Sequence, residues 1–200
     1  MLTSEKSSAA DLRKESILRA AFDVFATYGF KRTSMDDIAK AADISRPGLY
    51  QSFANKKEIF RAIVTLWSDD VCSQLEQATN EEMPLEQKLR IMFEKAVAEP
   101  VNSVIAMPHG EELFGLKNEY ASDLFGDWRE TVFDFIHKAF LDERGIDPAF
   151  AHMLAVMVDT AIAGMKADGL HGEALYAKFE AVLQIVAVSI QTKSDKSLSG

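Results

Sequence analysis

Apolar residues recur at helical spacing through almost all of the 200-residue chain. Ile17, Ala21 and Val24, for example, return every three or four positions and therefore lie on one stripe of a helix. The sequence contains no convincing run of alternating apolar and polar residues between turn signals, which is the pattern that indicates strands. We therefore predict an all-α fold.

Glycine, proline and capping residues divide this pattern into separate helices. Gly29 follows the first helix, and Gly145 with Pro148 marks a later boundary. We also expect a break over residues 100–110, which begin with a proline and end with a glycine. The expected helices cover residues 11–28, two short stretches after Ser34 and Ser45, and residues 55–78, 85–98, 122–143, 148–166 and 172–191.

The composition is typical of a soluble protein of a reducing compartment. Hydrophobic residues make up 48% of the chain, and Cys72 is its single cysteine, which excludes an internal disulfide or a cysteine-based zinc site. Residues 1–10 lack the apolar stretch of a signal peptide. The longest apolar run, at 181–190, is interrupted by Gln184 and Ser189. We therefore expect a cytoplasmic protein without a membrane span.

Charge is divided unevenly along the chain, whose formal net charge is -9. Residues 1–62 contain 11 Lys and Arg against 8 Asp and Glu, whereas residues 63–200 contain 11 against 23. A basic segment can bind phosphate, and an acidic remainder repels it. The asymmetry therefore restricts any nucleic-acid contact to the N-terminal part.

Two short predicted helices in that part have the spacing of a helix-turn-helix, with residues 43–45 as the turn. Ser34 with Asp37 three residues later forms a capping-box pattern before the first helix. Ser45 can cap the second helix, and Pro47 lies in its first turn, where a missing N–H costs nothing. In this motif the second helix enters the DNA major groove.

The outward face of the second short helix is rich in residues that suit DNA. Arg46 can bond a guanine edge in bidentate fashion, which is worth ~1 to 3 kcal/mol of discrimination. Gly48 allows a close approach of the backbone, and Pro47 can contact a thymine methyl group. Lys56 begins the next helix, where a cation opposes the macrodipole; this small cost makes sense if the lysine and nearby backbone N–H groups hold a phosphate. The same face also carries Tyr50, Gln51 and Ser52.

Three strings lie together within residues 17–60: YGFKRTS at 28–34, IAKAADISRPGLY at 38–50 and FANKKE at 53–58. This combination resembles the DNA-binding domain of TetR/AcrR transcriptional regulators, over about a quarter of the chain. Asp43 departs from the family's usual glycine, but aspartate tolerates the left-handed conformation of that turn. The resemblance implies phosphate contacts from Thr33, Ser45, Tyr50, Ser52 and Lys56, and base contacts from Arg46, Pro47, Gly48 and Gln51.

Either Thr33 or Ser34 can cap the helix that follows them, which leaves the other free to contact DNA. We therefore count both among the candidate DNA contacts.

Aromatic and sulfur side chains are frequent between residues 84 and 171, in a chain with 13 Phe and 8 Met. Each taken singly suits an ordinary core, but together they exceed what a small bundle needs, and ligand sites are mainly apolar. We predict a pocket for a small apolar or aromatic molecule, and the resemblance implies an inducer cavity in this region. The candidate lining residues are Met92, Phe93, Met107, His109, Phe114, Trp128, His152, Met153 and Met157.

The last two predicted helices are apolar on nearly all sides, so they need cover from more than one direction. A second copy of the chain would provide it. We therefore expect a homodimer joined by a four-helix bundle, which the resemblance also implies. A two-fold dimer requires a near-palindromic operator, with recognition helices spaced by about one DNA turn of ~34 to 36 Å or a multiple of it.

Motifs typical of enzymes and metal proteins are missing from the sequence. The four histidines show no HxxxH or HExxH spacing, and we find no GxSxG, GxxxxGK[ST] or GxGxxG string. We therefore expect no catalytic site, metal or cofactor. A helical protein-interaction module and an enzyme with an unrecognised pocket remain alternatives.

The sequence thus predicts a ligand-responsive DNA-binding regulator, a repressor that binds duplex DNA and a small effector. We expect a helix-turn-helix domain at residues 11–54, a helical ligand-binding and dimerisation domain at 55–191, and disordered tails at 1–10 and 192–200.

Overall fold

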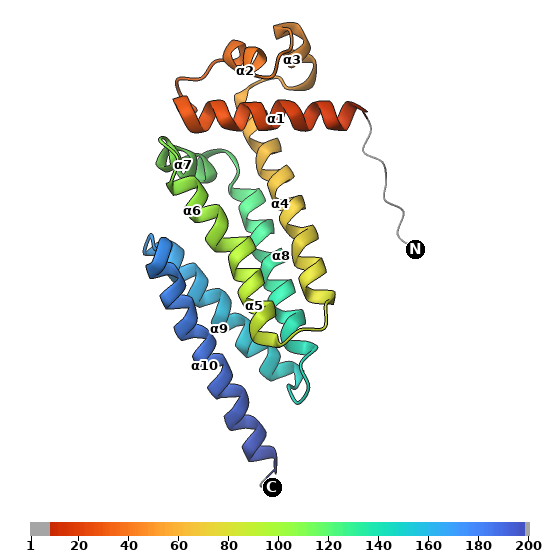
Figure 1. Cartoon of the computed structure of the whole chain (residues 1–200), viewed down its shortest axis with the longest axis vertical. Helices are drawn as coiled ribbons and strands as arrows, with labels where there is room; N and C mark the ends of the chain where they lie inside the picture. Colours follow the sequence, from red (N-terminus) through yellow and green to blue (C-terminus); the bar gives the residue numbers. More distant parts are fainter. Residues whose placement is uncertain (1–8, 199–200) are drawn as a thin grey trace. The chain divides into compact units, whose positions relative to one another are not determined.

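The computed structural model of the protein describes residues 9–198, and every regular element in that range is a helix (Figure 1). This confirms the all-α prediction. The helices are α1 (Ala9–Tyr28), α2 (Met35–Ala41), α3 (Arg46–Ser52), α4 (Lys56–Asn80), α5 (Leu85–Phe93), the π-helix η1 (Glu94–Ala98), α6 (Glu99–Ile105), α7 (Gly110–Tyr120), α8 (Ser122–Leu141), α9 (Pro148–Ala167) and α10 (Gly172–Leu198).

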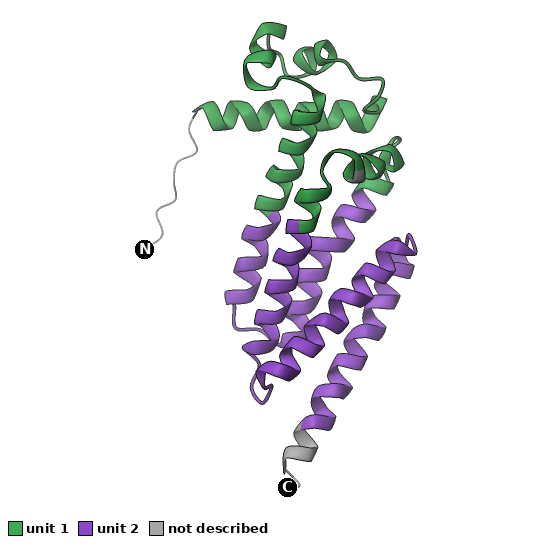
Figure 2. Cartoon of the chain, turned by 180° about the vertical axis from the view of Figure 1, so that it is seen from behind, with its two compact units in different colours: residues 1–70, 104–126 green, residues 71–103, 127–200 purple. Residues whose placement is uncertain are grey.

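The chain forms two compact units (Figure 2). Unit 1 comprises residues 1–70 and 104–126, and unit 2 comprises residues 71–103 and 127–200. Helices α4 and α8 each contribute residues to both units. The compact units do not coincide with the predicted domains, which divide the chain between residues 54 and 55. Those domains describe proposed roles, with DNA binding before the boundary and ligand binding after it.

Unit 1 is built around fully buried side chains from each of its first four helices, such as Phe25, Ile38, Leu49 and Ile59. Burial of such a side chain is worth ~1.5 to 3 kcal/mol. The same core cluster includes residues from a distant part of the sequence, namely Leu113, Leu116 and Ala121. The three-helix motif therefore depends on the 104–126 segment for part of its core.

Unit 2 is a bundle in which α5, α8, α9 and α10 bury apolar residues along their inward stripes. The rings of Phe93 and Phe179 stack with centroids 3.7 Å apart. Arg90 forms an ion pair with Glu180 of α10, and Asn102 accepts a hydrogen bond of 2.8 Å from the backbone N–H of Gly172. These contacts join the α5–α6 segment to residues 172–180, the first third of α10.

The helix runs through Pro100, so the expected break over 100–110 is wrong for residues 100–105. The N–H of Glu99 bonds the carbonyl of Glu94 five residues earlier, which makes the preceding turn a wide π turn. Pro100 directly follows this wide turn as the second residue of α6, and it has no N–H to donate to the helical hydrogen-bond ladder. The actual interruption covers only residues 106–109.

The ends of the chain also differ from expectation. Helix α10 continues to Leu198, so the described part of the expected tail at 192–200 is helical, and α1 begins at Ala9. No glycine or proline interrupts residues 173–198, and Lys193 pairs with Asp147 and lies 4.2 Å from the ring centroid of Phe150. Residues 1–8 and 199–200 lie outside the described range.

Helix α9 is long and apolar enough to cross a membrane by length and composition alone, with an 18-residue window of mean hydropathy 1.4. The expectation of no membrane span was based on continuous apolar runs, and α9 is not such a run because His152, Asp159 and Thr160 interrupt it. Six of its residues are buried in unit 2, as expected for the core helix of a bundle. They are Ala151, Leu154, Ala155, Val158, Ile162 and Met165.

Two glycines of α7 should respond in opposite ways to alanine. A Cβ at Gly110 would lie 1.9 Å from the carbonyl oxygen of Val104, whereas nothing lies within 4 Å of a Cβ at Gly115. We expect Gly110→Ala to lower the free energy of unfolding by about 1 to 3 kcal/mol, and Gly115→Ala to raise it by up to ~1 kcal/mol through helix propensity. Urea denaturation measures both changes in the free energy of unfolding. If the two substitutions had equal effects, the close approach of Gly110 to the Val104 carbonyl would be contradicted.

Candidate nucleic-acid interface

The loop between α1 and α2, residues 29–34, is held by side chains from separate parts of unit 1. The Thr33 hydroxyl donates to the carbonyl of Gly29 at 2.7 Å. From α4, the Lys56 ammonium donates to the carbonyls of Phe30 at 2.6 Å and Thr33 at 2.5 Å. From α7, the Glu112 carboxylate accepts from the backbone N–H of Lys31 at 2.8 Å. We call these interactions the loop clamp.

The loop clamp changes the roles of two predicted phosphate contacts. The Thr33 side chain is buried and already bonded within the loop, so it is not available to DNA. The Lys56 ammonium is occupied by loop carbonyls and lies 4.7 Å from the ring centroid of Phe30. Burial lowers the pKa of Lys56, as expected for an ammonium removed from water. Both residues therefore position the loop.

Ser34 caps α2, which resolves the competition between the two hydroxyls. Its Oγ accepts from the N–H of Asp37 at 3.2 Å, and the Asp37 carboxylate accepts from the Ser34 N–H at 2.8 Å. The Ser34 hydroxyl also donates to this carboxylate, and these hydrogen bonds lower the pKa of Asp37. The predicted capping box is confirmed.

The turn between α2 and α3 has the predicted local geometry. Asp43 adopts φ 51, the left-handed conformation, and the N–H of Ile44 reaches back to the carbonyl of Ala39 at 3.0 Å. Ser45 Oγ then accepts from the N–H of Gly48 at 3.2 Å and caps α3. The aspartate at the usual glycine position is therefore compatible with the turn.

Helix α3 buries one side and exposes the other. Leu49 is buried in unit 1, and Phe53 directly after the helix is buried as well. The Arg46 guanidinium lies 5.7 Å from the ring centroid of Tyr50, which holds both side chains on the outer face. The exposed residues of the helix and its cap are Ser45, Arg46, Pro47, Tyr50, Gln51 and Ser52, and Gly48 is half-buried.

Cations on the surface of unit 1 fall into two groups. Arg61 forms two hydrogen bonds of 2.7 and 2.6 Å with Asp123, and this guanidinium holds the pKa of that carboxyl well below its usual range. Lys40 pairs with Asp36 at 2.9 Å. Arg32 and Arg46, by contrast, have no ion pair within residues 9–198. Unpaired guanidinium groups are the ones that can bind phosphate without first losing a partner.

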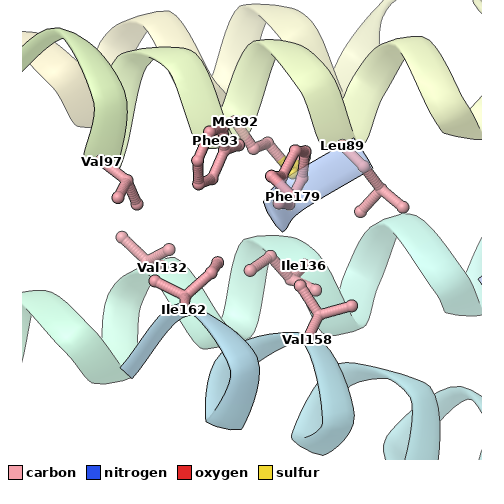
Figure 3. A pocket seen from close by; sticks show the side chains of 9 residues that line it. All are labelled: Leu89, Met92, Phe93, Val97, Val132, Ile136, Val158, Ile162 and Phe179. Carbon is pink, nitrogen blue, oxygen red and sulfur yellow. The ribbon is translucent and has the colours of Figure 1, made fainter. Parts of the chain in front are cut away.

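The predicted ligand residues are brought together only in small part. Unit 2 contains a cavity of about 10 Å³, and of the predicted residues only Met92 and Phe93 line it (Figure 3). Figure 3 shows their side chains directed toward those of α8 and α9 across a narrow gap. The other lining residues are Leu89, Val97, Val132, Ile136, Val158, Ile162 and Phe179.

The remaining candidates lie elsewhere. Met107, His109 and Phe114 belong to unit 1, Trp128 is buried without lining the cavity, His152 and Met153 are exposed, and Met157 is half-buried. The lining residues that the sequence did not reveal are mainly branched aliphatic ones, which resemble any other inward residue of a helix. A wider polar depression of about 390 Å³ lies against Glu82, Lys88, Asp142 and Glu143. Its charged lining does not suit the expected apolar molecule.

Comparison with known proteins relates this helix-turn-helix to transcriptional regulators. Residues 17–63 match the family model for bacterial regulatory proteins of the tetR family. The chain is 36% identical over 84 residues to the transcriptional activator FasR of Mycolicibacterium smegmatis, covering 42% of this chain and 38% of FasR. It is 33% identical over 69 residues to the regulator RutR of Escherichia coli K12, covering 32% of each. The matches thus span less than half of these relatives.

Solved structures extend the likeness to the fold of most of the chain. A TetR/AcrR regulator from Aquifex aeolicus superposes with a TM-score of 0.62 at 18% identity, over 88% of this chain and 98% of that one. SmeT, the repressor of the Stenotrophomonas maltophilia efflux pump SmeDEF, gives 0.57 at 19% identity, over 88% and 89%. The chain therefore has the fold of these regulators.

The loop clamp predicts different effects for two adjacent lysines. Lys56→Ala leaves loop carbonyls without their donor, and we expect the free energy of unfolding to fall by about 1 to 3 kcal/mol. Lys57 is exposed, and Lys57→Ala should change it by less than ~0.5 kcal/mol. Chemical denaturation of both variants measures the difference. Wild-type stability of the Lys56 variant would contradict the positioning role.

Proposed function

We propose that the protein is a ligand-responsive transcriptional repressor, because residues 17–63 match the family model for bacterial regulatory proteins of the tetR family and the chain has the fold of TetR/AcrR regulators. The observation that carries the proposal is the face of α3. This face exposes Arg46, Tyr50 and Gln51 on a helix whose other side is fixed by buried Leu49. Such a face suits the major groove.

Each α3 residue has a proposed role in that groove. Arg46 and Gln51 bond base edges, and Pro47 with Gly48 allows close apolar approach. Phosphate contacts come from Ser45, Tyr50 and Ser52, and the exposed Ser34 flanks them at the start of α2. Thr33 and Lys56 support this surface through the loop clamp and do not contact DNA directly.

We propose a homodimer formed through α9 and α10. Both helices expose large apolar residues, including Met153 at 57%, Ile185 at 54% and Val188 at 62% exposure. A second copy that covers this surface would bury it, and two-fold symmetry would then require a near-palindromic operator.

A repressor can act by occupying such an operator, and SmeT is an example of a structurally similar repressor. The relative FasR is a transcriptional activator, so similarity to FasR does not favour repression over activation. We therefore propose repression in the cytoplasm as the function, with ligand-induced release from DNA as the switch.

The effector we propose is a small apolar molecule that opens the cavity of unit 2. At about 10 Å³ the cavity has room for roughly one water molecule, so a ligand must separate the helices around it. A ligand that binds only the opened state shifts the population toward that state. Helix α4 contributes residues to both units, and its displacement would change the separation of the two recognition helices in the dimer.

Selection of bound sequences from a random duplex DNA library tests the function. With purified protein and no ligand, we expect enrichment of a near-palindrome, and binding that weakens steeply with salt because phosphates are contacted. Arg46→Ala should relax the preference at one base position in each half-site, worth ~1 to 3 kcal/mol.

The proposed function would be contradicted if the protein enriched no sequence, either without additions or in the presence of a metabolite extract. This result would favour a helical protein-interaction module. Retention of full sequence preference by the Arg46 variant would contradict only the assignment of that contact.

If the dimer forms through α9 and α10, a single charge introduced into this interface should separate the two copies. We expect Ile185→Asp to convert the dimer to a monomer, because it places a carboxylate in an apolar interface. Leu12→Asp is the matched control, since Leu12 of α1 is 57% exposed and lies outside the proposed interface. Sedimentation velocity distinguishes the two. A dimer that survives the Ile185 substitution unchanged would place the interface elsewhere.

A further inference from the structure

The recognition helix α3 has a basic neighbour that is distant from the helix-turn-helix strings in sequence. Arg13, in the first half of α1, has its Nη2 atom 3.7 Å from the position that a Cβ on Gly48 would occupy. The next residue, Lys14, has its Nζ 5.8 Å from the ring centroid of Phe53, which follows α3. Two successive cations of α1 therefore flank the two ends of α3.

Arg13 is exposed and has no carboxylate partner within residues 9–198. A nearby arginine on the same helix behaves differently, since Arg19 is bonded to Glu15 at 2.6 Å. The carboxylate of Glu15 raises the pKa of Arg19. Arg13 has no comparable carboxylate beside it within residues 9–198. Its guanidinium therefore keeps all five donors available to a ligand from outside the chain.

Glycine at position 48 makes this placement possible. It has no side chain of its own, and the Arg13 guanidinium lies beside this one position of α3. In helix-turn-helix proteins the N-terminal residues of the recognition helix are the ones that meet base edges. A cation beside these residues would therefore be close to the DNA backbone when the helix is bound.

We propose that Arg13 is a DNA-contact residue, which binds a phosphate of the operator beside the bases read by the first turn of α3. A planar guanidinium matches the geometry of a phosphate with two parallel hydrogen bonds. Lys14 adds a second positive charge at the other end of α3. The DNA surface then comprises α1 as well as the helix-turn-helix. This inference rests on the proposed DNA-binding function.

The test uses the full chain and the duplex enriched by selection, with affinity measured by fluorescence anisotropy over a series of salt concentrations. The variants are Arg13→Ala, Arg13→Lys and Arg144→Ala. Arg144 is the control because it is also exposed, has no ion pair in the described part of the chain, and lies in unit 2. Arg13→Ala and Arg144→Ala change the net charge equally.

We expect Arg13→Ala to weaken binding to specific and random duplexes alike, and to reduce the slope of log K against log salt by about one per protomer. Arg13→Lys should keep most of the slope, and Arg144→Ala should match the wild type. Thermal unfolding of each variant should be unchanged, since Arg13 is exposed.

Two results would overturn the proposal. If Arg13→Ala keeps the wild-type dependence of affinity on salt, Arg13 does not contact a phosphate, even if the affinity for the specific duplex falls. If the salt dependence is unchanged and the melting temperature is also lowered, Arg13 has a packing role beside Gly48. These results leave the proposed function intact. Absence of duplex binding by the wild type would instead contradict the function, and this inference with it.

Discussion

The placement of the helix-turn-helix depends on the hydrogen bonds that satisfy the backbone of the loop before it. Residues 29–34 leave the end of α1 through a left-handed Gly29 and expose carbonyls that no helix pairs. The Lys56 ammonium and the Glu112 carboxylate bond this backbone from two different helices. These hydrogen bonds hold the loop directly before α2, and α3 follows α2 through a tight turn.

This constraint explains why unit 1 includes residues 104–126. Glu112 comes from α7, and Leu113 and Leu116 of the same helix complete the core beneath the motif. Arg61 joins α4 to the start of α8 through Asp123. The helix-turn-helix is thus joined by hydrogen bonds and core packing to α7 and to the start of α8 within unit 1, so a rearrangement of α7 would also move the loop.

Local features of the fold and site could be predicted from the sequence, and features set by tertiary contacts could not. Ser34, Ser45 and Asp43 act within a few residues of their own positions, so capping and turn chemistry identify them. The intramolecular bonds of Thr33 and Lys56 could not be predicted, because their partners depend on how the loop folds onto α4. The cavity lining escaped prediction for a similar reason, since Val132 or Ile162 differs from any other inward aliphatic residue only by its neighbours.

The central claim is that DNA binds the surface formed by α3 and the residues around it. Hydrogen–deuterium exchange of the full chain, with and without the enriched duplex, tests this claim most directly. The account predicts slower amide exchange in α3, in residues 29–34 and in the first turns of α1, with no change in α5 or α8 beyond residue 127. Protection that is absent from α3, or confined to α9 and α10, would contradict it.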